Sequence, residues 1–287
     1  MNPPGHLDGL LAIVALYVGL IGACIGSFLN VCIYRIPRDE SIVRPGSHCP
    51  HCGRAIPWYL NLPVASWLLL RGRCRFCRGP ISPRYILVEL LTAVLFLAAL
   101  FQYSGYPRLL GLQPFDDWRL VPVHIVFIGG LILGTFVDFE HQIIPDSVTI
   151  GGIVAGLALS PLVPSMHAAA AWDQALGRAT AGAAFGFALV WLVGYLGEKA
   201  FKQEAMGFGD VKLMAAIGAF MGWKAVLFTM VMGSLFGSVV GVALIATRRA
   251  ELRGHIPFGP YLALAALSWV FWGQPLCDVY LNLLSFP

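Results

Sequence analysis

The sequence predicts an all-α integral membrane protein with about eight transmembrane helices and a small cytosolic insert. Three observations lead to this prediction. Hydrophobic residues make up 58% of the 287 residues and charged residues only 12%, which is far from the composition of a soluble domain. Apolar runs recur along nearly the whole chain, and most approach the roughly 20 residues that a spanning helix needs. One long polar stretch, rich in arginine, separates the first two runs.

The apolar runs carry hydrophobic side chains on all faces, whereas the strands of a transmembrane β-barrel would alternate in polarity, so we expect helices. The first run lacks a basic segment before it and a small-residue cleavage site after it. We therefore expect it to remain as an anchor and not to be removed as a signal peptide. The runs are 7–34, 86–103, 121–137, 148–163, 179–196, 211–221, 225–246 and 258–272.

The distribution of basic residues predicts the orientation. Nine of the 19 Lys and Arg residues lie in the polar stretch after the first run, which places that stretch in the cytoplasm and the N-terminus outside. Counting spans from there, segments 138–147, 198–212 and 247–256 also face the cytoplasm. The sixth run is short enough to be re-entrant, but the basic cluster in 247–256 would then lie outside. We therefore expect a true span.

The polar stretch contains two C-x-x-C pairs with 21 residues between them, close to the spacing of a zinc ribbon. Two disulfides are the competing interpretation, but a cytoplasmic location is reducing and disulfides rarely persist there. Four thiolate ligands leave no open position on a zinc ion, so the ion would be structural. The predicted ligands are Cys49, Cys52, Cys74 and Cys77.

These patterns divide the chain into three regions. We expect a first transmembrane helix at 1–36, a cytosolic zinc-binding insert at 37–84 and a larger transmembrane domain at 85–287. An insert of this size has only a small core, so a bound metal ion would supply much of its stability.

Four acidic residues lie at predicted cytoplasmic ends of spans, where ionisable groups are costly and are therefore candidates for function. For Asp146, which follows Pro145 at the start of an apolar run, an N-cap role is the stronger interpretation. Glu89 lies about one turn inside the second span; it could snorkel toward Arg84 or serve a function, and both interpretations stay open. Asp138 ends an apolar run beside the negative end of a helix dipole, where it has no cap to supply.

The fourth acid, Asp210, follows two glycines and precedes the sixth run. It could be an N-cap, but capping would not require Gly207 and Gly209. We predict that these glycines admit a substrate strand to which Asp210 is presented. Two carboxylates that share a proton activate water for attack on an amide, so Asp138 and Asp210 are predicted to form one hydrolytic site. Their positions at helix ends suggest that the shared proton rests mainly on Asp138.

Six blocks follow one another along the chain: GSFLNVCIYRIP (26–37), the paired C-x-x-C insert, RYILVELLTA (84–93), VDFEHQIIPD (137–146), EAMGFGDVKL (204–213) and IPFGPYLA (256–263). In this order they resemble the bacterial type IV prepilin peptidases, membrane aspartic proteases with a G-x-G-D motif. The resemblance implies an enzyme that cuts the basic leader from prepilins and pseudopilins after a glycine at the cytoplasmic face, with Asp138 and Asp210 as catalytic residues. One departure is Ile86, where the family usually has proline.

The resemblance also implies that the enzyme methylates the new N-terminus with S-adenosylmethionine. The sequence contains no glycine-rich loop between a strand and a helix of the kind that binds such cofactors. The resemblance directs the prediction to the first cytoplasmic boundary, at Gly26, Ser27, Asn30 and Arg35. Close helix packing at Gly26 and Ser27, and a positive-inside anchor at Arg35, are the alternatives.

The remaining expectations concern substrates and partners. Gly207, Gly209, Lys212 and Glu89 are the predicted substrate-binding residues, with Lys212 either orienting the acids or snorkelling. We expect prepilins, pseudopilins and the lipid bilayer of the bacterial inner membrane as partners, and no nucleic acid.

Two other classes of function are compatible with a membrane protein of this composition. A proton- or ion-coupled transporter would use intramembrane carboxylates, but it predicts internal symmetry and charges near mid-span, and the sequence shows neither. A noncatalytic scaffold that recruits partners through the insert would leave Asp138 and Asp210 replaceable.

Overall fold

The computed structural model describes residues 4–103, 117–202, 206–247 and 257–284. The described residues form helices, and extended pairing among them is confined to two isolated β-bridges in the insert. This confirms the all-α class. The chain forms two compact units, Met1–Phe101 and Gln102–Pro287. The predicted regions 1–36 and 37–84 both lie in the first unit.

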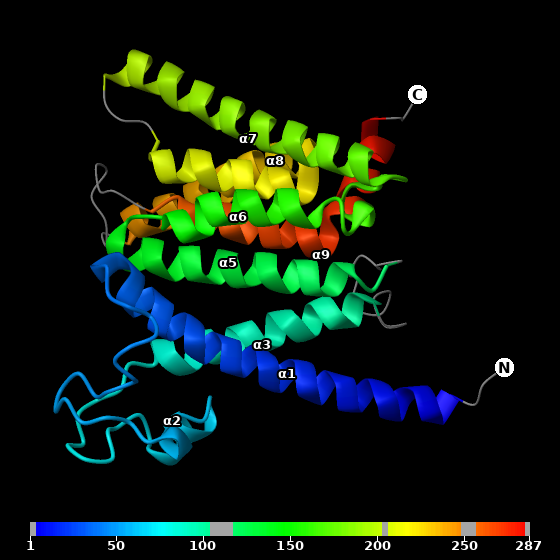
Figure 1. Ribbon diagram of the computed structural model, residues 1–287. Coiled ribbons are helices and arrows are strands. Elements are labelled where there is room, and N and C mark those ends of the chain that lie inside the picture. Colours follow the sequence, from blue (N-terminus) through cyan, green and yellow to red (C-terminus); the bar gives the residue numbers. More distant parts are fainter. Residues whose placement is uncertain (1–3, 104–116, 203–205, 248–256, 285–287) are drawn as a thin grey trace. The chain divides into compact units, whose positions relative to one another are not determined.

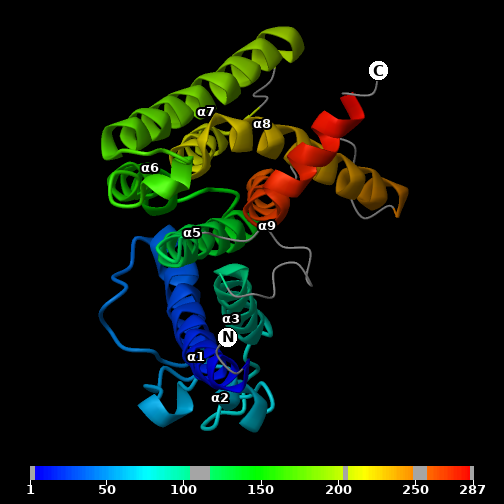
Figure 2. The ribbon, with the colours of Figure 1, turned by 90° about the vertical axis from the view of Figure 1, so that its right-hand side faces the viewer.

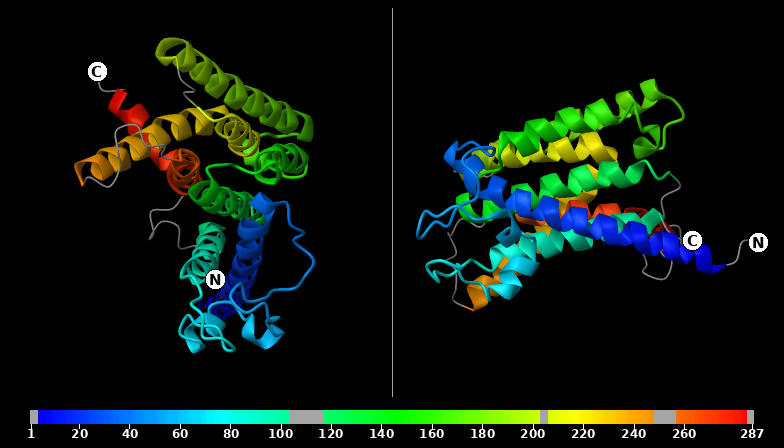
Figure 3. Two further views of the ribbon diagram at one scale, coloured as in Figure 1. Left: turned by 90° about the vertical axis from the view of Figure 1, so that its left-hand side faces the viewer. Right: turned by 60° about the horizontal axis from the view of Figure 1, so that its bottom comes forward.

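In the first unit, α1 (Pro4–Arg35) and α3 (Arg84–Tyr103) run side by side (Figures 1 and 3). Their backbones approach closely at two glycines of α1. A Cβ at Gly22 would lie 2.8 Å from the Cα of Ala93, and a Cβ at Gly26 would lie 2.7 Å from the Cα of Glu89. Because real side chains do not tolerate such distances, the two helices pack as they do only with glycine at these positions.

The insert connects α1 to α3. It contains two short 3₁₀ turns, η1 (Ile36–Arg38) and η2 (Trp58–Leu60), and one short helix, α2 (Ala65–Leu69). The rest of the insert consists of turns held by local backbone hydrogen bonds. Such a segment buries little apolar surface, so its stability depends on tertiary anchors and on cross-links.

The second unit consists of helices that pack around α8. Figure 2 shows α8 between α7 and α9, and α8 also packs against α6 while α9 packs against α5. Gly182 of α7 faces Gly218 of α8, and neither position has room for a Cβ. The elements are α5 (Leu120–His141), α6 (Asp146–Leu159), η3 (Pro164–His167), α7 (Trp172–Phe201), α8 (Phe208–Ala246) and α9 (Gly259–Leu284).

Each predicted apolar run lies wholly or largely within one helix. The sixth and seventh runs are consecutive segments of α8, interrupted at Gly222 with φ 77° and ψ 177°. Glycine reaches this conformation at little cost, and Figure 2 shows that the chain changes direction within α8. A span count of eight therefore requires that α6, α9 and both segments of α8 each cross the membrane.

Five helices in the described part of the chain are long and apolar enough to cross a membrane, which supports a multi-pass membrane protein. The helix α6 is apolar but shorter. The basic residues Arg248, Arg249 and Arg253, on which the predicted orientation partly depends, lie outside the described residues. The orientation therefore stays a prediction.

Candidate active site

Asp138 is buried near the C-terminal end of α5. The helix ends shortly after it, where the backbone N–H of Gln142 donates to the carbonyl of Asp138 at 2.9 Å. The Oδ2 atom of Asp138 accepts the backbone N–H of Gly259, the first residue of α9, at 3.1 Å. Asp138 lies near the C-terminal end of its own helix, as predicted, and in addition the N-terminus of a second helix meets its carboxylate.

Asp210 is buried in the first turn of α8. It is the third residue of that helix, so it is not the N-cap. The backbone N–H of Gly207, which directly precedes the helix, lies within hydrogen-bonding reach of the Asp210 carboxylate. A side chain that reaches back from the third helical position in this way resembles one half of a capping box. Asp210 therefore supports the helix start from within the helix.

The carboxylates of Asp138 and Asp210 lie close enough to interact electrostatically. The structure thus brings together the two acids that the sequence analysis paired. Both carboxylates lie at helix N-terminal ends, Asp138 at α9 and Asp210 at α8. The hypothesis that the shared proton rests mainly on Asp138 stays a prediction, and the N–H of Gly259 is a further group that acts on this carboxylate.

Ile144, in the loop between α5 and α6, lies between the two acidic segments. A Cβ at Gly209 would lie 3.3 Å from the Cβ of Ile144. A Cβ at Gly259 would lie 2.6 Å from the Oδ2 of Asp138 and 3.0 Å from the Cδ1 of Ile144. Gly209 therefore makes room for the chain's own isoleucine, and Gly259 makes room for the Asp138 carboxylate.

Gly207 differs from its neighbour Gly209. It is exposed, and among the described residues a Cβ there would meet only the Oδ2 of Asp210, at 3.5 Å. Of the two glycines predicted to admit a substrate, Gly207 has the open surroundings that this role needs. The sequence analysis assigned no role to Gly259. In the sequence, Gly259 is a glycine at the start of the last apolar run, and no pattern in the neighbouring residues predicts its contact with Asp138.

Lys212 forms an ion pair with Asp146 and lies 5.5 Å from the centre of the Phe208 ring. Asp146 is the first residue of α6, with Pro145 in the N-cap position, so the predicted N-cap role of Asp146 is wrong. The ion pair instead connects the first turn of α6 to the first turn of α8, which carries Asp210.

Glu89 belongs to the first unit and is buried on α3. Its Oε2 accepts the backbone N–H of Val64 at 2.7 Å, and the Ser27 side chain lies within hydrogen-bonding reach of the same carboxylate. Val64 has φ 61° and ψ −53°, a strained conformation for a β-branched residue. The carboxylate thus holds the strained start of α2 against the helix pair, and no ion-pair partner of Glu89 occurs among the described residues.

Asn30 is buried at the same helix interface. Its Nδ2 donates to the carbonyls of Tyr85, at 3.0 Å, and Gly26, at 3.3 Å. Its Oδ1 is buried and has no hydrogen-bond partner within the described ranges. Since buried polar atoms are nearly always hydrogen-bonded, this oxygen marks a place for a donor that the described residues do not supply.

The other two predicted cofactor residues have contacts that account for them structurally. Gly26 permits the close approach of α1 to α3. The buried guanidinium of Arg35 donates to the carbonyls of Ser41, at 2.8 Å, and Pro45, at 2.7 Å, and so organises the start of the insert. Within the predicted cofactor set, the polar atoms available to a ligand are therefore those of Asn30 and Ser27.

The four cysteine Sγ atoms lie within 4.8 Å of one another. The Sγ atoms of Cys49 and Cys77 are 3.8 Å apart, too far for a disulfide. Four sulfurs about 2.3 Å from a tetrahedral zinc ion would be separated by about 3.8 Å, so the cluster could hold zinc. The two knuckles match, because Cys49 donates its N–H to Arg54 at 2.9 Å and Cys74 donates to Gly79 at 2.8 Å.

The electrostatics of the cluster also suit a cation. The backbone N–H groups of Cys77 and Phe76 lower the pKa of Cys74 to about 6. At Cys77 the N–H of Gly79 acts in the same direction, but desolvation and the neighbouring thiols outweigh it and raise the pKa to about 11. A positive ion between the sulfurs would favour the ionised form of Cys77, whose pKa is raised without one.

Two family models match this chain, and their matched regions correspond closely to the two units. A family model described as "Bacterial Peptidase A24 N-terminal domain" matches residues 20–103, and one described as "Type IV leader peptidase family" matches residues 125–242. A relative from Myxococcus xanthus, named prepilin leader peptidase/N-methyltransferase, is 43% identical over 99% of this chain and 79% of its own length. The chain belongs to the type IV leader peptidase family. This confirms the resemblance found in the sequence, and the transporter alternative is not supported.

Two further relatives carry the same name. The one from Aeromonas hydrophila is 36% identical over 92% of this chain, and the one from Pseudomonas aeruginosa is 33% identical over 93%; each alignment covers 93% of the relative. No solved structure matches this chain. Asp138 and Asp210 both lie in the region that matches the leader peptidase family model, whereas Gly259 lies beyond it.

Proposed function

We propose that this protein cleaves the leader peptide of type IV prepilins and pseudopilins after a glycine and then methylates the new N-terminal amine. The names of the relatives support both activities. The observation that carries the cleavage proposal is the pairing of two buried carboxylates, Asp138 and Asp210, at two helix starts.

In the proposed cleavage step, one carboxylate takes a proton from water while the other, protonated, hydrogen-bonds to the scissile carbonyl. The hydroxide oxygen bonds to the carbonyl carbon, the C–N bond breaks, and the leaving amine takes up a proton. The N–H of Gly259 holds one oxygen of Asp138, and the N–H of Gly207 holds Asp210. These bonds keep both carboxylates oriented toward the same water.

The substrate must present an extended backbone at this site, because a helical peptide hides its carbonyls. Gly207 is exposed and directly precedes the helix of Asp210, so we assign it to contact with the substrate backbone. Gly209 and Lys212 act indirectly in this proposal. Gly209 admits Ile144, and Lys212 ties the start of α8 to α6 through Asp146.

We assign the methyl transfer to the helix pair of the first unit. The unpartnered Oδ1 of Asn30 and the buried carboxylate of Glu89 are acceptors, and they fit a ligand that carries an amine. We assign Asn30, Ser27 and Glu89 to binding, and Gly26 and Arg35 to shaping the site. S-adenosylmethionine would supply the methyl group when bound.

The cysteine cluster is proposed to hold a structural zinc ion. With four protein ligands the ion has no position for a substrate. Its role is to fix the insert that carries Val64, whose N–H meets Glu89. We further propose that the protein resides in the bacterial inner membrane with its N-terminus outside and its active site facing the cytoplasm, as the basic residues predict.

The test replaces Asp138 and Asp210 separately with Asn and follows leader cleavage of a prepilin in membranes. Asp173→Asn is the matched control, because Asp173 is an exposed acid in the first turn of α7. We expect both variants to lose cleavage and the control to retain it. Cleavage at a near wild-type rate in either variant would contradict the paired-acid mechanism.

A further inference from the structure

The segment 58–70 of the insert, which includes η2 and α2, exposes large apolar side chains. Trp58 is 80% exposed and Leu69 is 82% exposed. The other exposed apolar residues of the segment are Tyr59, Leu62 and Leu68. A water-soluble insert with a small core would bury its few large apolar side chains first. Several exposed ones in a single short segment therefore mark an interaction surface.

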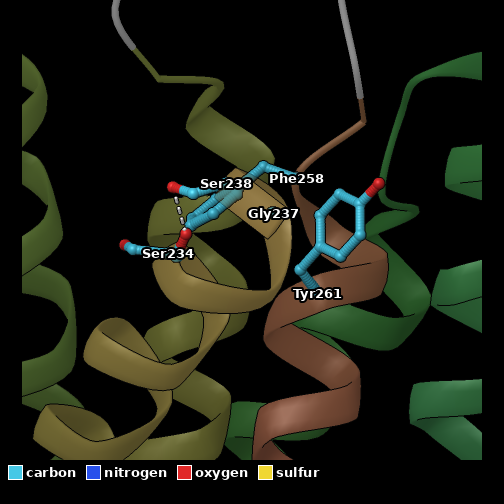
Figure 4. Close-up of a pocket in the computed structure, with 5 residues that line it drawn as sticks. All are labelled: Ser234, Gly237, Ser238, Phe258 and Tyr261. Carbon is cyan, nitrogen blue, oxygen red and sulfur yellow. Dashed lines mark hydrogen bonds between the residues drawn. The ribbon is translucent and has the colours of Figure 1, made fainter. Parts of the chain in front are cut away.

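Two aromatic residues of the second unit show the contrast. Figure 4 shows Phe258 and Tyr261 at a cavity of about 350 Å³ beside Gly237. Both residues are half-buried, and a Cβ at Gly237 would lie 3.4 Å from the ring of Tyr261 and 3.7 Å from that of Phe258. The backbone of α8 thus covers part of each ring. The exposure of Trp58 shows that no comparable packing covers its ring within the described part of the insert.

The short helix α2 has an inverted polarity. Ser66 is buried, and its hydroxyl accepts the backbone N–H of Leu62 at 3.0 Å. Leu68 and Leu69 are exposed on the same helix. A helix with water on its outer face shows the opposite order, with leucine inside and serine outside. An outer face made of leucine is typical of an element that lies against lipid.

The segment lies beside the first turns of a membrane-spanning helix. The backbone N–H of Val64 donates to the Oε2 of Glu89 on α3 at 2.7 Å, and Figure 1 shows α2 next to the start of α3. Glu89 is five residues after Arg84, the first residue of α3, which corresponds to about 7.5 Å along the helix axis. The nearby Leu87 and Leu90 of α3 are exposed and apolar. The segment therefore reaches the level at which the lipid-facing surface of α3 begins.

Basic side chains follow the segment. Arg71 and Arg73 come directly after α2, and Arg75 and Arg78 belong to the second knuckle; all four are exposed. Residues 41–88 contain no Asp or Glu. The phosphates of anionic lipids attract such arginines within a screening distance of about 8 Å. Aromatic, leucine and arginine side chains in one segment are the combination found where a protein lies in a membrane surface.

We propose that the segment 58–70 is embedded in the lipid–water interface of the bilayer, and that the arginines after it bind anionic lipid headgroups. Trp58 and Tyr59 lie at the level of the headgroups, and Leu68 and Leu69 lie among the first carbons of the acyl chains. The remainder of the insert stays in water. Lipid thus covers the surface that the small core of the insert leaves open.

Photocrosslinking tests the lipid contact directly. The full-length protein carries p-benzoylphenylalanine in place of Leu69, an exposed position that accepts a larger side chain, and is reconstituted into vesicles of phosphatidylethanolamine and radiolabelled phosphatidylglycerol. The matched control carries the same amino acid in place of Pro50, an exposed residue between the cysteines of the first knuckle. We expect irradiation to attach about tenfold more labelled lipid at position 69 than at position 50.

The headgroup contact is tested in the same protein. Replacing Arg71 and Arg73 together with Gln should lower the labelling by phosphatidylglycerol about fivefold, and labelling by phosphatidylcholine in neutral vesicles should not change. Arg54→Gln is the control, because Arg54 is an exposed arginine of the first knuckle, and it should leave both labels unchanged. Equal labelling by both lipids, insensitive to Arg71 and Arg73, would refute the binding of anionic headgroups.

Circular dichroism first establishes that each labelled protein keeps the helical content of the wild type, and Trp58 offers a second labelling position with the same expected result. Protein with wild-type helicity that yields no lipid adduct at either position would overturn the proposal. Adducts to protein in place of lipid would overturn it as well, because they would assign the segment to a protein contact. Equal lipid labelling at positions 50 and 69 would show that the segment has no special place in the interface.

Discussion

The two units each hold buried carboxylates at helix contacts, but they do so in different ways. In the second unit, Asp138 and Asp210 lie near each other, and each meets a backbone N–H at the start of a helix. In the described part of the first unit, Glu89 has no second carboxylate acting on it and meets a backbone N–H of the insert. A pair of acids can share a proton and activate water, whereas a single carboxylate can bind an ammonium group.

This difference teaches that burial alone does not assign a function to an acid. Glu89, Asp138 and Asp210 are all buried at helix ends or one turn inside them. They differ in the groups that surround each carboxylate. The following predictions test whether the two units carry the two activities separately.

The largest effect is expected from the paired acids. Asp138→Asn or Asp210→Asn should lower leader cleavage by about 10²- to 10⁴-fold, since an amide cannot act as a general base or donate an acidic proton. Methylation of a peptide already cleaved should continue in both variants. Parallel assays on purified membranes measure this, and a loss of both activities in folded protein would argue against separate sites.

The next effect concerns zinc. Cys74→Ser should abolish stoichiometric zinc, measured by elemental analysis of the purified protein. Because the insert supplies the Val64 N–H that holds Glu89, methylation should fall more than cleavage. Ser47→Ala, at a half-buried position of the insert before the first knuckle, is the control and should retain the metal. Full methylation by protein without bound zinc would contradict the proposed dependence of the Glu89 site on the zinc-bound insert.

Glu89→Gln should lower methylation about 10- to 100-fold while cleavage stays intact. The amide oxygen still accepts the N–H of Val64, so the fold is kept and only the charge is lost. Binding of a cleaved peptide by calorimetry should weaken, and binding of the same peptide with an acetylated amine should not change. Glu40→Gln, an exposed acid of the insert, is the control. Equal weakening for both peptides would indicate a structural role.

A smaller effect is expected at Gly259. A Cβ would lie 2.6 Å from the Oδ2 of Asp138, so Gly259→Ala must displace that carboxylate. Overpacking of this kind costs about 1–3 kcal/mol, and we expect cleavage to fall about tenfold or more. Gly207→Ala, whose Cβ would meet only Asp210 at 3.5 Å, should reduce cleavage less. The reverse order of effects would show that Asp138 can move freely.

The smallest effect is expected at the ion pair. Lys212→Met should alter cleavage only a few-fold, because exposed pairs are weak and the side chain acts through the start of α8. Asp146→Asn should have a similar effect, and the double variant should be no worse than either single one. Additive losses would show that Lys212 contacts the substrate independently of Asp146.

Much of the site could be predicted from local sequence patterns. The cysteine set follows from a spacing that is visible along the chain, and the structure gathers the four sulfurs. Asp138 and Asp210 stood out as acids at the ends of apolar runs, and the structure brings them together. The N-cap role of Asp146 failed because Pro145 takes that position, and Lys212 offers a partner that no local pattern shows.

By itself, the sequence determined the helical membrane class, and it predicted the cysteine cluster that could hold a metal and the two acids that the structure brings together. These features depend on hydropathy, spacing and helix ends, which are properties of short segments. The tertiary structure decided that Gly259, 121 residues from Asp138, supplies its hydrogen bond, that Gly209 admits Ile144, and that Val64 reaches Glu89. Such contacts arise only when helices far apart in the chain pack together, because each donor lies on a different element from its acceptor.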